Sequence, residues 1–316
     1  MKIRNVSLLG LVFFIALFTG CSQQQVIRLN YTPGQSSVYK SVIENSRSVE
    51  FTGPASRQKD ISGGTSGAKV EMVFTQTIEE VDDSGIATAK ITIDQIQAVI
   101  TTKDVTTLDF DSSRAEDKDK PLGSLIGKSY VIKISPNGKF VTVVDIDEIK
   151  KVAAANKGKS KLLITLFAPQ SLEERHSIVA LNGAPASAVK SGDSWSIKEK
   201  EDFDMMGTKG YEKIYTVSNL ESAGGIAVVK MEAVPDTASE EEIYTSSDAS
   251  PLSKSSDNIV TFKGVLEIDL SKSVVKKYVE SLESSWTVID PQTKDRPEPN
   301  ALIMSTARIN RLELIK

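Results

Sequence analysis

The stretch "TIEEVDDSGIATAKI", residues 77–91, decides the fold class of this chain. From residue 87 onward, small or apolar side chains alternate with Thr and Lys at a period of two, the pattern of a strand with one buried face. Residues 82–85, Asp-Asp-Ser-Gly, are the residue types that form tight turns. The stretch therefore predicts an antiparallel β-hairpin.

The same pattern recurs along most of the chain. Residues 38–44 alternate in the same way, and turn sequences stand at residues 135–138 (Ser-Pro-Asn-Gly) and 223–225 (Ala-Gly-Gly). Val, Ile and Thr, which suit a pleated sheet, are frequent on both sides of these turns. Consecutive antiparallel hairpins are expected.

Two similar stretches of the sequence suggest an internal duplication, and each such pair is called a sequence echo here. "TVSNLESAGGIAVVKM", residues 216–231, matches residues 77–91 with one residue inserted at the turn, and residues 127–144 and 264–282 form a looser second pair. Chance similarity of two hairpins is the alternative, because turn and strand residues recur widely. A repeat spacing above 100 residues predicts two related lobes. The expected fold is mainly β, with two antiparallel lobes forming a half-barrel or curved sheet.

A helical segment is expected between the lobes. Four apolar residues of residues 145–155 share one helical face, and Asp145 or Asp147 could cap it; they are Ile146, Ile149, Val152 and Ala153. Pro169 should end a second apolar stretch, and residues 171–174 should open another short helix. This segment is interpreted as a connector that packs on the core, with a lid or a partner-binding face as the alternative.

The expected division of the chain follows these patterns. It comprises residues 1–20 (export signal), 21–30 (lipidated tether), 31–144 (N-terminal lobe), 145–182 (helical insertion) and 183–316 (C-terminal lobe). Three loops are predicted to be mobile, solvated tips because they are rich in Gly, Ser or charge: residues 52–69, 104–120 and 236–258.

The N-terminus has the order of an export signal. Lys2 and Arg4 precede an apolar run over residues 6–18, and two small residues then lead to Cys21, the single cysteine of the chain. This arrangement resembles the lipobox of bacterial lipoproteins. The resemblance implies that Cys21 becomes the acylated N-terminus, an anchor that needs several acyl chains to hold firmly. Ser22 in place of Asp after the cysteine also implies the outer membrane, and the tract after Cys21 is not acidic, which favours a protein that faces the periplasm.

Charge and cysteine content narrow the function classes. Without residues 1–20 the chain has 36 basic and 42 acidic side chains, a net charge of −6, which disfavours nucleic-acid binding. Once Cys21 is acylated, no thiol is left for a disulfide, a nucleophile or a metal site. No metal or cofactor is predicted.

Three apparent motifs do not support an enzyme. "GSLIGKS", residues 123–129, lacks the spacing of a phosphate-binding loop and leads into a predicted strand rather than a helix. Ser194 in "GDSW" has no histidine downstream to act as a base, since His176 is the single histidine and is expected at a surface or interface. Residues 109–120 lack the glycine and the final acid of a calcium loop.

A wider resemblance rests on four motifs in order after an exported N-terminus. They are "YTPGQSSVYK" (31–40), "DSGIATAKI" (83–91), "IGKSYVIKISPNGKFVTV" (126–143) and "SGDSW" (191–195). In this order the chain resembles a family of exported bacterial proteins known only as a domain of unknown function, over about residues 28–316. The resemblance implies a two-lobed β-rich fold and no catalytic residues.

The sequence thus favours a non-catalytic lipoprotein of the cell envelope. It would touch the membrane through its acyl chains and hold an apolar ligand or lipid in a curved sheet beneath the helices. The alternative is a scaffolding lipoprotein that binds another envelope protein through loops or edge strands. A third reading is an enzyme that uses a carboxylate pair with no recognisable motif.

Overall fold

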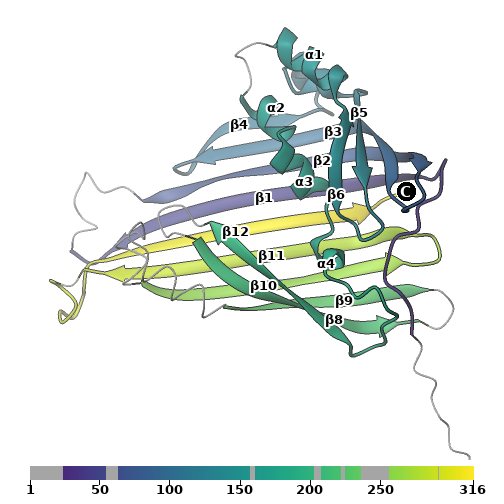
Figure 1. Cartoon of the computed structure of the whole chain (residues 1–316). Helices are drawn as coiled ribbons and strands as arrows, with labels where there is room; N and C mark the ends of the chain where they lie inside the picture. The colour runs from purple at the N-terminus through teal and green to yellow at the C-terminus, as the bar shows by residue number, and fades with distance from the viewer. Residues whose placement is uncertain are drawn as a thin grey trace, which may run out of the picture.

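The computed structural model describes residues 24–54, 63–156, 161–202, 208–221, 225–235, 256–290 and 292–316. Within them one open antiparallel sheet of twelve strands dominates, which confirms the mainly β fold (Figure 1). The strands are β1 (Ser36–Thr52), β2 (Gly64–Val81), β3 (Ala87–Thr102), β4 (Val105–Asp111), β5 (Ser129–Ile134), β6 (Phe140–Asp145), β7 (Ser194–Asp202), β8 (Thr208–Leu220), β9 (Ile226–Pro235), β10 (Ser256–Asp269), β11 (Val274–Ile289) and β12 (Ala301–Leu314).

The first and last strands, β1 and β12, are neighbours in the middle of the sheet. The strand order is β6-β5-β3-β2-β1-β12-β11-β10-β9-β8-β7, with β4 paired only to β3. Strands β1 to β6 run in order from the centre of the sheet to one edge, with β4 paired only to β3. The helices connect that edge to β7 at the opposite edge, and β7 to β12 return in order to the centre. The first and last strands then pair over their length, from Tyr39 with Leu314 to Thr52 with Ala301. Purple β1 and yellow β12 lie side by side in Figure 1.

Short turns join neighbouring strands as the sequence predicts. Gly85 and Gly138 have φ angles of 83° and 71°, a left-handed conformation that residues with a Cβ rarely adopt. Asp82 accepts hydrogen bonds from the N–H groups of Ser84 and Ile86 and so closes the β2–β3 turn. Local turn chemistry therefore sets these hairpins.

The two faces of the sheet differ. One face, which carries Tyr39, Phe74 and Tyr278, packs against the helices and holds most of the core; we call it the helix-covered face. The other, which carries Lys40 and Glu313, is the open face. Because strand side chains alternate, every second residue of each strand faces the helices.

Among the described residues between β6 and β7, four α-helices cover one face of the sheet (Figure 1). They are α1 (Asp147–Ala155), α2 (Lys161–Leu166), α3 (Pro169–His176) and α4 (Val179–Asn182). Ile149 and Val152 are the buried residues of α1, on the face expected from the sequence. The Asp145 carboxylate accepts the N–H of Asp147, the first residue of that helix. Pro169, expected to end a helix, instead occupies the first position of α3, where its missing N–H is not needed.

Two predicted loops are strand in part. Residues 64–69 belong to β2 and residues 105–111 form β4, whose first three residues are exposed as the composition suggested. A short 3-10 helix, Ala115–Asp117, follows β4. Residues 55–62 and 236–255, the rest of the first loop and most of the third, lie outside the described residues.

The two echoing hairpins share one irregularity. In the β2–β3 pair the register shifts between Ile78 and Glu80, and in the β8–β9 pair it shifts between Val217 and Asn219. These positions correspond in the sequence echo, so each hairpin has a bulge at the same distance from its turn. Both strand sets belong to a single sheet, and duplication into two lobes stays a prediction.

Candidate functional site

A cleft of about 410 Å³ opens on the helix-covered face beside α3 and α4. Its volume lies in the range of small-molecule sites. Six strands from both halves of the sheet supply its floor, and the two helices supply one wall. The side chains that line the cleft include Asn45, Glu173, Glu174, Glu199, Lys213, Phe262, Glu280, Leu282, Arg308 and Asn310.

A buried ion pair stands at the β7–β8 side of the cleft. Nζ of Lys213 lies 2.5 Å from Oε2 of Glu199, and it also lies 4.9 Å from the ring centroid of Phe262. The Lys213 side chain is 5% exposed, whereas that of Glu199 is 31% exposed. Moving an ammonium out of water is costly, so a lysine at a core position of a strand needs a specific reason. Recognition of a polar group in the cleft is such a reason.

Sequence reasoning missed this pair, although a signal exists. On β8, Tyr211, Lys213 and Tyr215 are alternate residues of one face, and both tyrosines are fully buried. A lysine between two inward-facing aromatic residues breaks the alternation of polar and apolar positions. That break marks Lys213 as a residue to examine.

Tyrosine hydroxyls and a carboxylate extend the polar site beneath the surface. The hydroxyl of Tyr278 accepts the N–H of Val179, the first residue of α4, at 3.2 Å. Burial, and then the negative charge of Glu280, raise the pKa of Tyr278 far above its usual value. Burial also raises the pKa of Tyr215, whose hydroxyl has no hydrogen-bond partner among the described residues. Both hydroxyls keep their protons and can donate hydrogen bonds.

The space directly under α3 is filled by side chains. A cavity of about 30 Å³ is left there between Tyr39, Phe74 and His176, room for about one water molecule. His176 is buried, not exposed: its Nε2 lies 2.8 Å from the hydroxyl of Tyr130, and its ring meets that of Phe74 edge-on. It holds α3 against the sheet.

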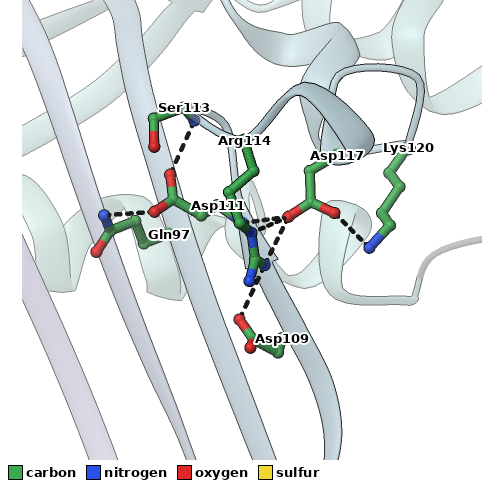
Figure 2. Close-up of polar contacts among 7 residues, drawn as sticks. All are labelled: Gln97, Asp109, Asp111, Ser113, Arg114, Asp117 and Lys120. Atoms are coloured by element: carbon green, nitrogen blue, oxygen red, sulfur yellow. Dashed lines mark hydrogen bonds and ion pairs between the residues drawn. The ribbon is translucent and has the colours of Figure 1, made fainter.

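Residues 109–120, which lack the glycine and final acid of a calcium loop, contain a cluster of ion pairs around Asp117 (Figure 2). The Asp117 carboxylate accepts the N–H of Asp111 at 2.8 Å and pairs with Arg114 at 2.6 Å and with Lys120. Arg114 also reaches Asp109 at 2.9 Å. Hydrogen bonds and these cations lower the pKa of Asp117 to about 2. Across the described part of the chain, no group of three or more His, Cys, Asp or Glu side chains is arranged to hold a metal ion.

The other sequence motifs have structural positions. Residues 123–125 form a 3-10 turn, and β5 rather than a helix follows at Ser129. Gly192 adopts a φ of 93° just before β7, and Trp195 is buried, stacked on Tyr215 and donating from Nε1 to the Ala180 carbonyl at 2.9 Å. Cys21 lies outside the described residues. None of the helices in the described ranges is both long and apolar enough to cross a bilayer.

Comparison with known proteins gives a family and no activity. Residues 84–273 match the "Family of unknown function (DUF6263)", and the chain belongs to that family. No curated protein matches. Among solved structures, one titled "Lipid-protein interactions in lipovitellin" is similar at a TM-score of 0.45 and 11% identity, over 90% of this chain. The chain spans a quarter of the length of that lipovitellin chain.

Proposed function

We propose that this member of the DUF6263 family is a non-catalytic, lipid-anchored protein of the bacterial envelope that binds an amphiphilic ligand in the cleft beside α3 and α4. The observation that carries the proposal is the cleft of about 410 Å³, which combines apolar and charged walls. The outer membrane, facing the periplasm, is the proposed location, and Cys21 is the proposed site of acylation.

The walls of the cleft favour an amphiphile over a purely apolar molecule. Phe262 and Leu282 offer buried apolar surface, whereas Glu173 and Arg308 place charge at the opening. A purely apolar ligand would leave these charged groups and the Lys213–Glu199 pair without water, which is unfavourable. A molecule with an apolar chain and a polar head satisfies both surfaces.

A binding titration with a matched pair of variants tests the cleft. Asn45 lines the cleft, whereas its neighbour Glu44, which pairs with Lys69, faces the opposite side of the same strand. Asn45→Trp should fill the cleft and weaken displacement of a fluorescent fatty acid by a lysophospholipid at least tenfold. Glu44→Trp should bind as the wild type does. Equal affinity in both variants would exclude the cleft as the site.

The anchor is tested separately in living bacteria. Labelled palmitate should enter the wild-type protein and be absent from Cys21→Ser, which should leave the membrane fraction. Incorporation that is independent of Cys21 would refute the proposed site.

A scaffolding role is the second candidate, and the filled space under α3 favours it, because a cavity of about 30 Å³ holds no ligand. Such a protein would bind its partner through loops rather than strand edges. The edge strand β7 alternates Lys and Glu over residues 198–201, a pattern that discourages pairing with another strand. Failure of every amphiphile to bind, together with crosslinking to one envelope protein, would favour this role.

A further inference from the structure

We propose that the surface around the Gln25–Val189 bridge docks on the anionic face of the bilayer that holds the anchor. This inference rests on the proposed acylation of Cys21 and adds a fixed orientation to it. The surface comprises Val26, Arg28, Ala186, Ser187, Ala188 and Lys190.

The chain is fixed to the domain almost as far as the anchor. Gln25 and Val189 exchange two backbone hydrogen bonds of 2.9 and 2.8 Å, and the N–H of Leu29 donates to the Pro136 carbonyl at 2.7 Å. Ile27 and Leu29 are each 3% exposed and belong to the main core. The tether is therefore part of the folded domain from Gln25 onward.

The remaining free length is short. Gln25 is four residues beyond Cys21, and four extended residues span at most about 14 Å. An acylated Cys21 sits at the membrane surface, so the bridge cannot move further from it than this length. The bridge therefore stays close to the membrane surface, and the charge of the surrounding surface decides whether this end of the sheet docks on it.

The composition of this surface suits anionic lipid. Residues 24–30 and 184–192 contain no Asp or Glu, and Arg28 and Lys190 are exposed. Asp193 directly follows this surface and accepts the backbone N–H of Lys190. Val26 is 37% exposed, and residues 186–188 are small and exposed, so the backbone can approach the head groups closely. Cations near an anionic membrane surface favour binding to it.

The opposite end of the sheet is far away and serves as a control. The loop of residues 292–300 follows β11, whose 16 residues rise about 3.3 Å each, so it lies roughly 50 Å from the bridge end. In Figure 1 the purple N-terminal segment and the C-terminus share one end, and the β11–β12 connection lies at the other. Asp295 is exposed on that distant loop.

The test uses the full-length acylated protein with one introduced cysteine. Acylation consumes the thiol of Cys21, the single natural cysteine, so Ala188→Cys or Asp295→Cys alone carries a fluorophore. The proteins are reconstituted into vesicles of phosphatidylethanolamine and phosphatidylglycerol (3:1) with head-group nitroxide quencher. We expect at least fivefold stronger quenching at position 188 than at 295. In phosphatidylcholine vesicles, or with Arg28→Gln/Lys190→Gln, this ratio should fall at least twofold.

The outcomes separate the docking from the anchor. Equal quenching at both positions, or a ratio that lipid charge and the double variant leave unchanged, overturns the docking while the acylated mass of the protein upholds the anchor. An intact mass without acyl chains overturns the anchor, and the docking falls with it.

Discussion

Nε2 of His176 lies 2.8 Å from the hydroxyl of Tyr130, and this contact joins the last residue of α3 to strand β5 in the interior of the protein. The imidazole is the single histidine of the chain. Burial, and then the charge of neighbouring Arg175, hold its pKa well below the usual 6.5. The folded protein therefore keeps this ring neutral.

Burial of His176 makes stability fall as the pH falls below 6.5. Unfolded chains take up a proton on His176 near pH 6.5 and folded chains do not, so the free energy of unfolding should drop by up to about 1.4 kcal/mol per pH unit. His176→Gln should remove most of this dependence between pH 7.5 and 5.5. Urea unfolding at each pH measures it. An unchanged dependence in the variant would contradict the assignment.

Trp195 should fasten α4 to the edge of the sheet. Trp195→Phe removes the donor to the Ala180 carbonyl and leaves that carbonyl buried, which should cost about 1–3 kcal/mol of unfolding free energy. Ser194→Ala, which loses an exposed contact with Thr216, should change stability little. Chemical denaturation compares the two. Equal losses of unfolding free energy in the two variants would show that the indole hydrogen bond does not stabilise the protein more than the exposed Ser194 contact does.

The Lys213–Glu199 pair should respond asymmetrically. Glu199→Gln removes a carboxylate that pairs with a deeply buried ammonium and should cost about 3–5 kcal/mol. Lys213→Met leaves a carboxylate that water can reach and should cost less, about 1–3 kcal/mol. The double variant should be more stable than the sum of the single losses implies. Additive losses in a double-mutant cycle would show that the two side chains do not interact.

The Asp117 cluster should support acid stability. The Asp117 carboxyl group has a pKa of about 2 in the folded protein, against the usual 3.8, so the folded state releases this proton more readily than the unfolded state. The resulting stabilisation is present above pH 3.8 and is lost as the pH falls towards 2. Asp117→Asn should lower the melting temperature at pH 7 and move acid unfolding to higher pH. Asp119→Asn, an exposed neighbour, is the control. Identical melting curves for both variants would argue against the cluster.

Local sequence patterns could predict the hairpins but not how they assemble. Alternation and turn residues around Gly85 and Gly138 are encoded over a few neighbouring positions, and the structure has these turns. The pairing of β1 with β12 joins residues about 250 positions apart, and no local pattern specifies it. The single sheet, and with it a cleft lined by both halves, therefore could not be foreseen.

In two places the composition of a segment suggested an environment that differs from the one in the structure. Residues 104–120 are charge-dense, yet Asp109, Arg114, Asp117 and Lys120 pair with one another and order the segment after β4. His176 looked like a surface residue because it follows charged neighbours in sequence, but the C-terminal end of α3 faces the sheet. The partner of His176 lies on β5, which the sequence alone could not place beside α3. The partners of Asp117 are three residues away on either side, and composition does not show that such neighbours pair.

The most direct test of the proposed function is a native mass spectrum of the full-length protein purified from bacterial membranes, followed by organic extraction. The wild type and Glu44→Trp should each carry one amphiphile of defined mass beyond the acyl chains on Cys21, and Asn45→Trp should lose it. Spectra without any adduct, or with the same adduct in all three proteins, would contradict binding in the cleft.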